Sequence, residues 1–184
     1  MLNLWEPNSL SYNKPKVCPN KPPKQVLLSY LNSAGPFTTL SGTVQFQKRL
    51  DYVIQCRVNK ISISSPAGVT LMGGYAIYFS SSRLGGLIGQ TPFVTAIGTN
   101  TSTLVAFEQS NIIGMSDLAQ LNLANNAEPA SRSSQINPIL PFITPSPIES
   151  FDWQVGLING ALTLTAAYTV EIEIEFYQAC RCSQ

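Results

Sequence analysis

The last third of the chain carries an alternation of apolar and polar residues that runs for sixteen positions, from Leu162 to Tyr177. Apolar side chains occupy the even positions, and threonine and glutamate occupy most of the odd ones. Because successive side chains of a β-strand point to opposite sides, a period of two predicts a strand with one buried face. At about 3.3 Å per residue the run would reach roughly 50 Å. A strand of that length is expected to bend across a sandwich or to extend past its partner.

The outer face of this predicted strand carries three glutamates at alternate positions, Glu171, Glu173 and Glu175. Like charges on one face of a sheet repel one another unless cations lie on the neighbouring strand. We therefore expect lysine or arginine opposite this row. A metal site is the weaker interpretation, because ligands on one straight strand cannot surround an ion unaided.

Shorter runs of the same kind fill the chain from Gln25 onward, separated by turn residues. The run over 50–64 changes phase at Lys60 and Ile61, which predicts a β-bulge or a corner near Asn59. Asn159 and Gly160 indicate a type I′ turn that would join two strands as a closing hairpin. The remaining predicted elements are strands at 25–31, 42–47 and 69–79, a hairpin from 93–97 and 103–107, a loop over 80–90, a short helix capped at Ser116 and Asp117, and a proline-rich surface loop over 128–147.

These elements predict an all-β protein, with about eight antiparallel strands, one short helix and no βαβ unit. Among antiparallel sandwiches, the single jelly roll has two four-stranded sheets and is the architecture we expect, with immunoglobulin-like and other sandwiches as the alternatives. A chain of 184 residues and 20.0 kDa is sufficient for one domain with one core. We place that domain at residues 25–184.

Residues 1–24 differ from the rest in composition and are predicted to form an extended N-terminal arm. They hold five of the 13 prolines, which fix φ and remove backbone donors. They also hold Lys14, Lys16, Lys21 and Lys24 against one acid, Glu6. We expect this arm to contact a neighbouring subunit. Its positive charge is sparse for a genome-packaging tail, so nucleic acid is not an expected partner.

The charge content restricts the classes of function that the chain can have. Charged residues make up 11% of the sequence, against about 25% in an ordinary soluble domain. A free monomer usually keeps its solubility through charge, so a charge-poor surface favours a protein covered by neighbouring subunits. The chain has no histidine, which removes the commonest general base and metal ligand. We therefore expect no enzyme activity and no cofactor.

Other chemical motifs are weak. A carboxylate pair for acid and base catalysis could be sought at Glu149 and Asp152, or at Glu108 and Asp117, but solvated or helix-capping roles are simpler for these residues. The glycine-rich segment 84–89 lacks the Gly-Lys-Ser/Thr sequence of a phosphate-binding loop.

The four cysteines, at positions 18, 56, 180 and 182, lack the paired spacing of a zinc site. Reduced thiols are the simpler expectation for a protein made inside a cell. The alternative is a disulfide that joins the two ends of the chain, from Cys18 to Cys180 or to Cys182. No signal peptide is recognised, and no apolar stretch is long enough to predict a membrane span.

Three segments together resemble the single jelly-roll capsid proteins of viruses, of the penton or minor-capsid kind. They are the arm KPKVCPNKPPK, the β-run LDYVIQCRVNKISIS and the long strand LTLTAAYTVEIEIEFY. The resemblance implies a structural virion protein that assembles into an icosahedral shell. Its implied partners are copies of itself, as a pentamer, together with other capsid proteins, and its implied location is the capsid shell of the virion.

A second interpretation is a lectin-like or receptor-binding β-sandwich that displays aromatic residues on its loops. Its partner would be a host receptor or a glycan. It predicts a soluble monomer or trimer with affinity for glycans, whereas the capsid interpretation predicts a larger assembly.

Overall fold

A computed structural model shows an all-β protein and describes residues 16–37, 39–64, 76–89, 95–98, 104–107, 111–117, 137–157, 163–164 and 166–180. One helix lies within these ranges, α1 (Ser82–Ile88). The strands are β1 (Lys24–Asn32), β2 (Gly35–Pro36), β3 (Leu40–Ser64), β4 (Ala76–Ser80), β5 (Thr95–Gly98), β6 (Leu104–Phe107), β7 (Ile112–Asp117), β8 (Leu140–Leu157), β9 (Thr163–Leu164) and β10 (Tyr168–Gln178).

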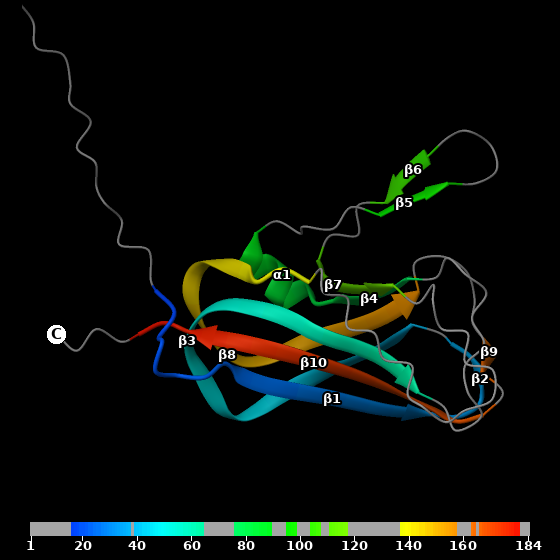
Figure 1. The fold of residues 1–184 in the computed structure, drawn as a ribbon, viewed down its shortest axis with the longest axis horizontal. Helices are drawn as coiled ribbons and strands as arrows, with labels where there is room; N and C mark the ends of the chain where they lie inside the picture. Colours follow the sequence, from blue (N-terminus) through cyan, green and yellow to red (C-terminus); the bar gives the residue numbers. More distant parts are fainter. Residues whose placement is uncertain are drawn as a thin grey trace, which may run out of the picture.

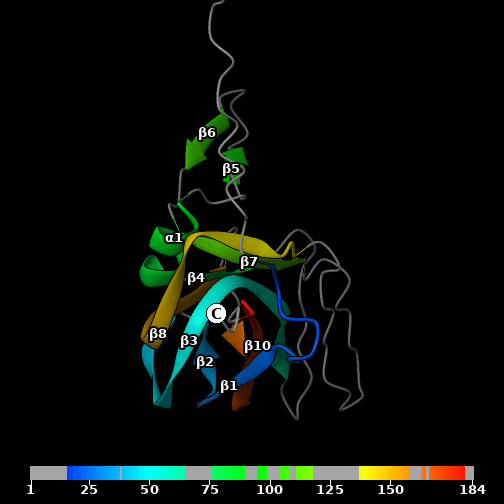
Figure 2. The same ribbon diagram turned by 90° about the vertical axis from the view of Figure 1, so that its left-hand side faces the viewer.

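The main sheet has the strand order β1-β10-β3-β8-β4-β7 and folds over on itself into two layers (Figures 1 and 2). The fold is possible because β3 and β8 are long and bent. The first part of β3, over 40–45, pairs with the end of β8, over 150–155. Its later part pairs with the start of β8 on one side and with β10 on the other. Each of these two strands therefore contributes to both layers.

Counted by layer, the sandwich has two sets of four antiparallel strand segments. One layer runs β1, β10, the second part of β3 and the first part of β8. The other runs the first part of β3, the second part of β8, β4 and β7. The predicted antiparallel sandwich of jelly-roll type is confirmed. The small pairs β2-β9 and β5-β6 are additions to it, and β5-β6 matches the expected hairpin at 93–107.

The apolar face of β10 supplies the centre of the core, as the alternation predicted. Its even-numbered side chains from 168 to 176 are all buried, and these are Tyr168, Val170, Ile172, Ile174 and Phe176. Phe176 reaches the other layer, where its ring centroid lies 5.8 Å from that of Phe151 and 6.1 Å from that of Phe46. Aromatic rings at such separations add to the free energy gained by burying their area. The two layers are therefore held together along this line.

The expected bulge in β3 lies at Asn59. Glu173 is opposite Lys60 while Ile174 is opposite Val58, so Asn59 is the extra residue. This bulge restores the inward phase for Ile61 and Ile63, both of which are buried.

Cations lie opposite the row of glutamates, as the repulsion argument required. Lys60 and Arg57 of β3 are opposite Glu173 and Glu175 in the register of the strands. The lysine forms its ion pair diagonally, with 3.7 Å between its Nζ and the Oε2 of Glu171.

The helix that the structure describes, α1, lies where the sequence predicted none. Residues 82–88 were expected to form a loop, whereas they form α1. Conversely, Ser116 and Asp117 were expected to cap a helix and instead end strand β7. The rest of that predicted helix falls outside the described residues.

Two predictions about β8 are also wrong. Residues 140–147 were expected to be a proline-rich loop, yet they form the first part of the strand. Prolines are accepted there because this part lies at the edge of its layer, where one side of the strand needs no donors. The predicted closing hairpin also fails, because β8 pairs with β3 and β4 while β10 pairs with β1 and β3.

Candidate functional site

The described end of the N-terminal arm lies along the C-terminal end of β10. Val17 pairs with Ala179, the backbone N–H of Cys18 donates to the carbonyl of Gln178 at 3.1 Å, and that of Cys180 donates to the carbonyl of Lys16 at 3.2 Å. This pairing is antiparallel, as is the pairing of β1 with β10. Residues 16–18 thus extend β1 beyond a bulge, and residues 19–23 form that bulge.

The four lysines predicted for the arm do not share one place. Lys16 is exposed beside β10, and Lys24 is the first residue of β1, opposite Phe176. Lys21 lies in the bulge, where its N–H donates to the carbonyl of Cys18 at 3.2 Å. Lys14 falls outside the described residues. Lys21 and Lys24 line a cavity of about 680 Å³, and neither was connected with that cavity by the sequence.

This cavity, which we call the β3 corner cavity, lies where β3 passes from one layer to the other. Its lining comes from three regions that are distant in the sequence: the bulge after the arm with Lys24 at the start of β1, residues 45–52 of β3, and Gln178 and Ala179 at the end of β10. The basic side chains in the lining are Lys21, Lys24, Lys48 and Arg49, and the acidic one is Asp51.

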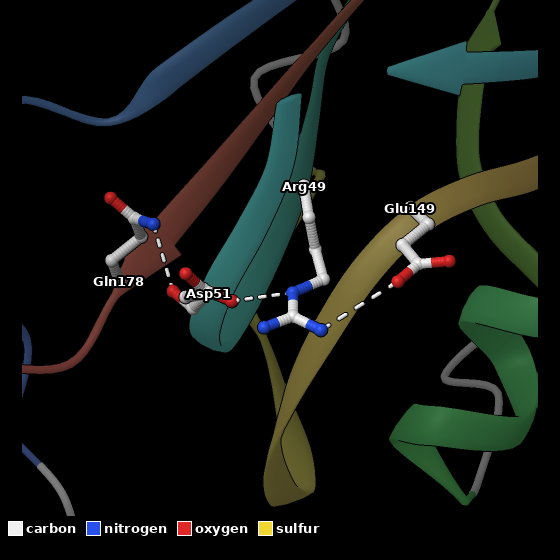
Figure 3. A network of polar contacts seen from close by, with 4 residues as sticks. All are labelled: Arg49, Asp51, Glu149 and Gln178. Carbon is white, nitrogen blue, oxygen red and sulfur yellow. Dashed lines mark hydrogen bonds and ion pairs between the residues drawn. The ribbon is translucent and has the colours of Figure 1, made fainter. Parts of the chain in front are cut away.

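The rim of the cavity is ordered by a polar network (Figure 3). The Nε of Arg49 lies 2.7 Å from Oδ1 of Asp51, and its Nη1 lies 3.6 Å from Oε1 of Glu149. The carboxylate of Asp51 raises the pKa of the guanidinium, which therefore stays charged. On the other side, the amide of Gln178 donates to the carbonyl of Asp51 at 2.8 Å. Strands β3, β8 and β10 are thereby linked at this corner.

Tyr52 has an unusual conformation in the same lining. Its φ is 53°, in the left-handed region that a bulky residue rarely adopts. Its carbonyl accepts a hydrogen bond from the N–H of Ala179 at 2.8 Å. The alternation from Leu50 to Val58 predicted an inward side chain here, but Tyr52 is 51% exposed. The positive φ and the shift in strand register at this point turn its ring outward.

Two of the cysteines considered for a disulfide lie together. The thiols of Cys18 and Cys180 share a hydrogen bond, which lowers the pKa of Cys18 and outweighs the opposing effect of desolvation. Neither forms a disulfide here, and Cys182 falls outside the described residues. Cys56 differs, because its burial raises its pKa to about 12 and leaves it unreactive.

Exposed apolar side chains gather at the two edges of the layer that contains β1. On β1, which pairs with β10 on one side and with no described strand on the other, Leu27 is 63% exposed and Leu31 is 72% exposed. We call these two residues together with Tyr30 the β1 edge surface. At the opposite edge, Ile143 of β8 is 71% exposed, and the nearby Ile139 is also exposed. Monomeric proteins usually blunt such edges with charge.

Of the carboxylates considered for catalysis, Glu108 falls outside the described residues, Asp117 ends strand β7, and the other two are structural or solvated. Asp152 accepts hydrogen bonds at the start of α1, and Glu149 is exposed beside Arg49. Within the described ranges no group of three or more cysteines and acids is placed to hold a metal ion. No described helix is long and apolar enough to span a membrane.

Comparisons with known proteins add little to this picture. No family model matches the chain, and no curated protein does. Among solved structures, a chain of Desmodium yellow mottle tymovirus is similar at 12% identity and a TM-score of 0.23. That match covers 94% of this chain and 99% of the other. A TM-score this low carries no argument about function.

Proposed function

We propose that this protein is a structural subunit of an icosahedral virus shell, a single jelly-roll capsid protein of the penton or minor-capsid type. Its partners would be copies of itself and other capsid proteins. Its location would be the virion. The observation that carries the proposal is the pair of exposed apolar edges on one layer of the jelly roll.

The β1 edge surface has the properties of a contact between proteins. Strand β1 is nine residues long and, among the described strands, pairs with β10 alone, so no described strand takes up the N–H and C=O groups on its other side. Apolar side chains stand beside those groups, and the one lysine of the strand is at its first position. Such an edge is open to pairing or packing with another chain.

The opposite edge supports a head-to-tail arrangement. Because β1 and the first part of β8 are at the two ends of the same layer, an interface between them would be heterologous. A heterologous contact closes into a ring when the rotation between subunits allows it. Ile139 and Ile143 at the β8 edge would then face Leu27 and Leu31 of the next subunit. A pentamer is the ring that we propose.

The arm adds a second proposed contact. Residues 16–18 are held on β10 of the same chain, so residues 1–15 would be the part that reaches a neighbour. Fifteen extended residues span at most about 50 Å, enough to cross an adjacent subunit. Lys14 belongs to this proposed contact and Lys16, exposed beside β10, lies at its base, whereas Lys21 and Lys24 face the cavity of their own chain.

The test is the assembly state of the full chain, measured by light scattering on a size-exclusion column and by negative-stain imaging. We expect the wild type to form rings. The double variant Leu27→Glu/Leu31→Glu should disrupt these rings, and so should the single variant Ile143→Glu. Ser41→Glu adds a charge at an exposed position of the other layer and should leave the rings intact.

A monomer at every protein concentration would contradict the proposal. A monomer or trimer that binds glycans on an array would instead favour the lectin-like interpretation. Thermal melting of each variant must show that it is folded, so that loss of rings is not loss of structure.

A further inference from the structure

We propose that the β3 corner cavity binds nucleotides, with its lysines holding the phosphate and Tyr52 supporting the base. The ligand could be a free nucleotide or a unit of a single nucleic-acid strand, since both present a phosphate beside a planar base. This goes beyond the shell role and does not depend on it. It also departs from the expectation that the sparse lysines of the arm exclude such a partner.

The β3 corner cavity collects a large share of the positive charge of the chain. Of the 11 basic residues in the whole chain, four line this one cavity, namely Lys21, Lys24, Lys48 and Arg49. Arg49 is compensated by Asp51 and Glu149. The three lysines form no ion pair with any described residue. The cavity therefore has an excess of positive charge that suits a phosphate.

The charges are held in place by ordered backbone. Hydrogen bonds from Lys21 to Cys18 and from Cys18 to Gln178 fix the bulge that carries Lys21. Lys24 is fixed by the start of β1, and Lys48 belongs to the corner of β3. Because these backbone positions are already set, binding an anion does not require the chain to rearrange, which reduces the entropic cost.

The aromatic lining distinguishes a nucleotide from a bare anion. Tyr52 is half exposed and its backbone is held in the left-handed region, a strain that is often kept at functional sites. Phe46, which packs partly against the core, lies in the same lining. Aromatic side chains next to basic ones are the usual platform for unpaired bases, because every base has a face that can stack.

The remaining lining and the size of the cavity agree with this ligand. The amides of Gln45 and Gln47 are exposed in the lining and can both donate and accept hydrogen bonds at the edge of a base. A volume of about 680 Å³ is within the range of small-molecule sites, about 300–1,000 Å³.

The experiment measures binding of four probes to the full chain: inorganic phosphate, adenosine monophosphate, a twelve-nucleotide oligothymidylate, and an acidic peptide with the same net charge as the oligonucleotide. Calorimetry serves the small probes, and fluorescence anisotropy serves the labelled strands. Binding of the monophosphate alone would assign the site to free nucleotides. Tighter binding of the oligonucleotide would assign it to a strand, and both results support the proposal.

Two sets of variants test the lysines and the ring separately. The triple variant K21Q/K24Q/K48Q should weaken nucleotide binding at least tenfold, and should lower the dependence of log affinity on log salt by about 2 for the oligonucleotide. Tyr52→Ala should weaken binding of both nucleotides at least about fivefold, leave phosphate binding unchanged, and be rescued by Tyr52→Phe.

Matched controls decide the outcome. Lys48→Gln should weaken binding, whereas Arg83→Gln removes one charge from the exposed side of α1 and should have no effect. Equal effects of these two variants would overturn the proposal, as would nucleotide binding that survives the triple variant. Tyr52→Ala without effect, or equal binding of the acidic peptide, would overturn the assignment to nucleotides. Circular dichroism establishes that each variant is folded.

Discussion

Asp152 accepts two hydrogen bonds from Ser82, at 2.8 Å from its backbone N–H and at 2.7 Å from its hydroxyl, across 70 positions of sequence. The other carboxylate oxygen accepts from the N–H of Arg83 at 2.9 Å. The hydroxyl of Ser81 accepts from the N–H of Leu84 at 3.2 Å as the N-cap. Donors that the first turn of a helix leaves without partners are thus satisfied from β8.

Replacing Asp152 should therefore destabilise the fold through α1. We expect Asp152→Ala to lower the free energy of unfolding by about 1–2 kcal/mol, the usual cost of a lost cap. Urea denaturation followed by circular dichroism measures this. Glu149→Ala is the control, since that side chain is 70% exposed and its partner Arg49 keeps Asp51. An equal loss in both variants would contradict the capping role.

The same carboxylate should give the stability a pH dependence. Partial burial acts to raise the pKa of Asp152, but the hydrogen bonds from Ser82 and Arg83 outweigh it and the pKa is lowered. A lowered pKa in the folded state contributes stability that is complete above the unfolded value, about 3.9, and is lost as the pH falls through the folded value.

We therefore expect the wild type to exceed Asp152→Asn in stability at pH 7 and the difference to narrow below about pH 4. Urea midpoints measured from pH 7 to strongly acidic conditions provide the test. A difference that stays constant over this range would show that the charge of Asp152 is not involved.

Gly114 of β7 should not tolerate a side chain, because β7 packs closely against β3 of the other layer at this position. A Cβ built on it would lie 2.6 Å from the Cβ of Val58, on the facing strand. Gly114→Ala should cost about 1–3 kcal/mol by overpacking. Gly86→Ala is the matched control, because a Cβ there meets nothing within 4 Å and alanine is the better helix former. Thermal melting should move in opposite directions for the two variants.

Oxidation should join the two ends of the domain. With hydrogen peroxide as the oxidant, Cys18 and Cys180 would lose their two thiol hydrogens, form one S–S bond and reduce the peroxide to water. Peptide mapping by mass spectrometry should find Cys18 linked to Cys180 or to Cys182. Cys56→Ser should not change this product, since Cys56 is buried. Exclusive linkage between different molecules would contradict the pairing.

Deletion of residues 1–15 should leave the domain folded and weaken its assembly. The cut spares Val17 and Cys18, whose backbone contacts hold the bulge on β10. Size-exclusion chromatography should show smaller species at the same concentration, with an unchanged melting temperature. Unchanged oligomers would exclude a role for the arm between subunits.

How much the sequence could predict depended on whether the determining contacts were local. The buried face of β10 and the bulge at Asn59 follow from side-chain alternation, which the pleat of a strand imposes residue by residue. Helix α1 was missed because two glycines disfavour it locally, and the Asp152 cap comes from 70 positions away. The pairing of β8 was missed because its prolines suit a loop unless the strand is at an edge.

The β3 corner cavity was beyond sequence reasoning for a related reason. Its lysines come from the bulge, from the start of β1 and from β3, and the bulge is positioned by the end of β10, more than 150 residues later. The one local signal was the neighbouring pair Lys48 and Arg49 between two predicted strands. The outward turn of Tyr52 depends on its positive φ, which alternation cannot reveal.

The two layers share β3 and β8, each of which is continuous from one layer to the other. Neither layer can then unfold while the other stays intact, because separating the layers would break the strand pairing of β3 and β8 in both layers. Denaturation should consequently occur as one cooperative event, and a load applied to one face would be passed along the backbone itself to the opposite face. In the proposed capsid role, this continuity would let the subunit resist pressure from inside the particle without separation of its layers.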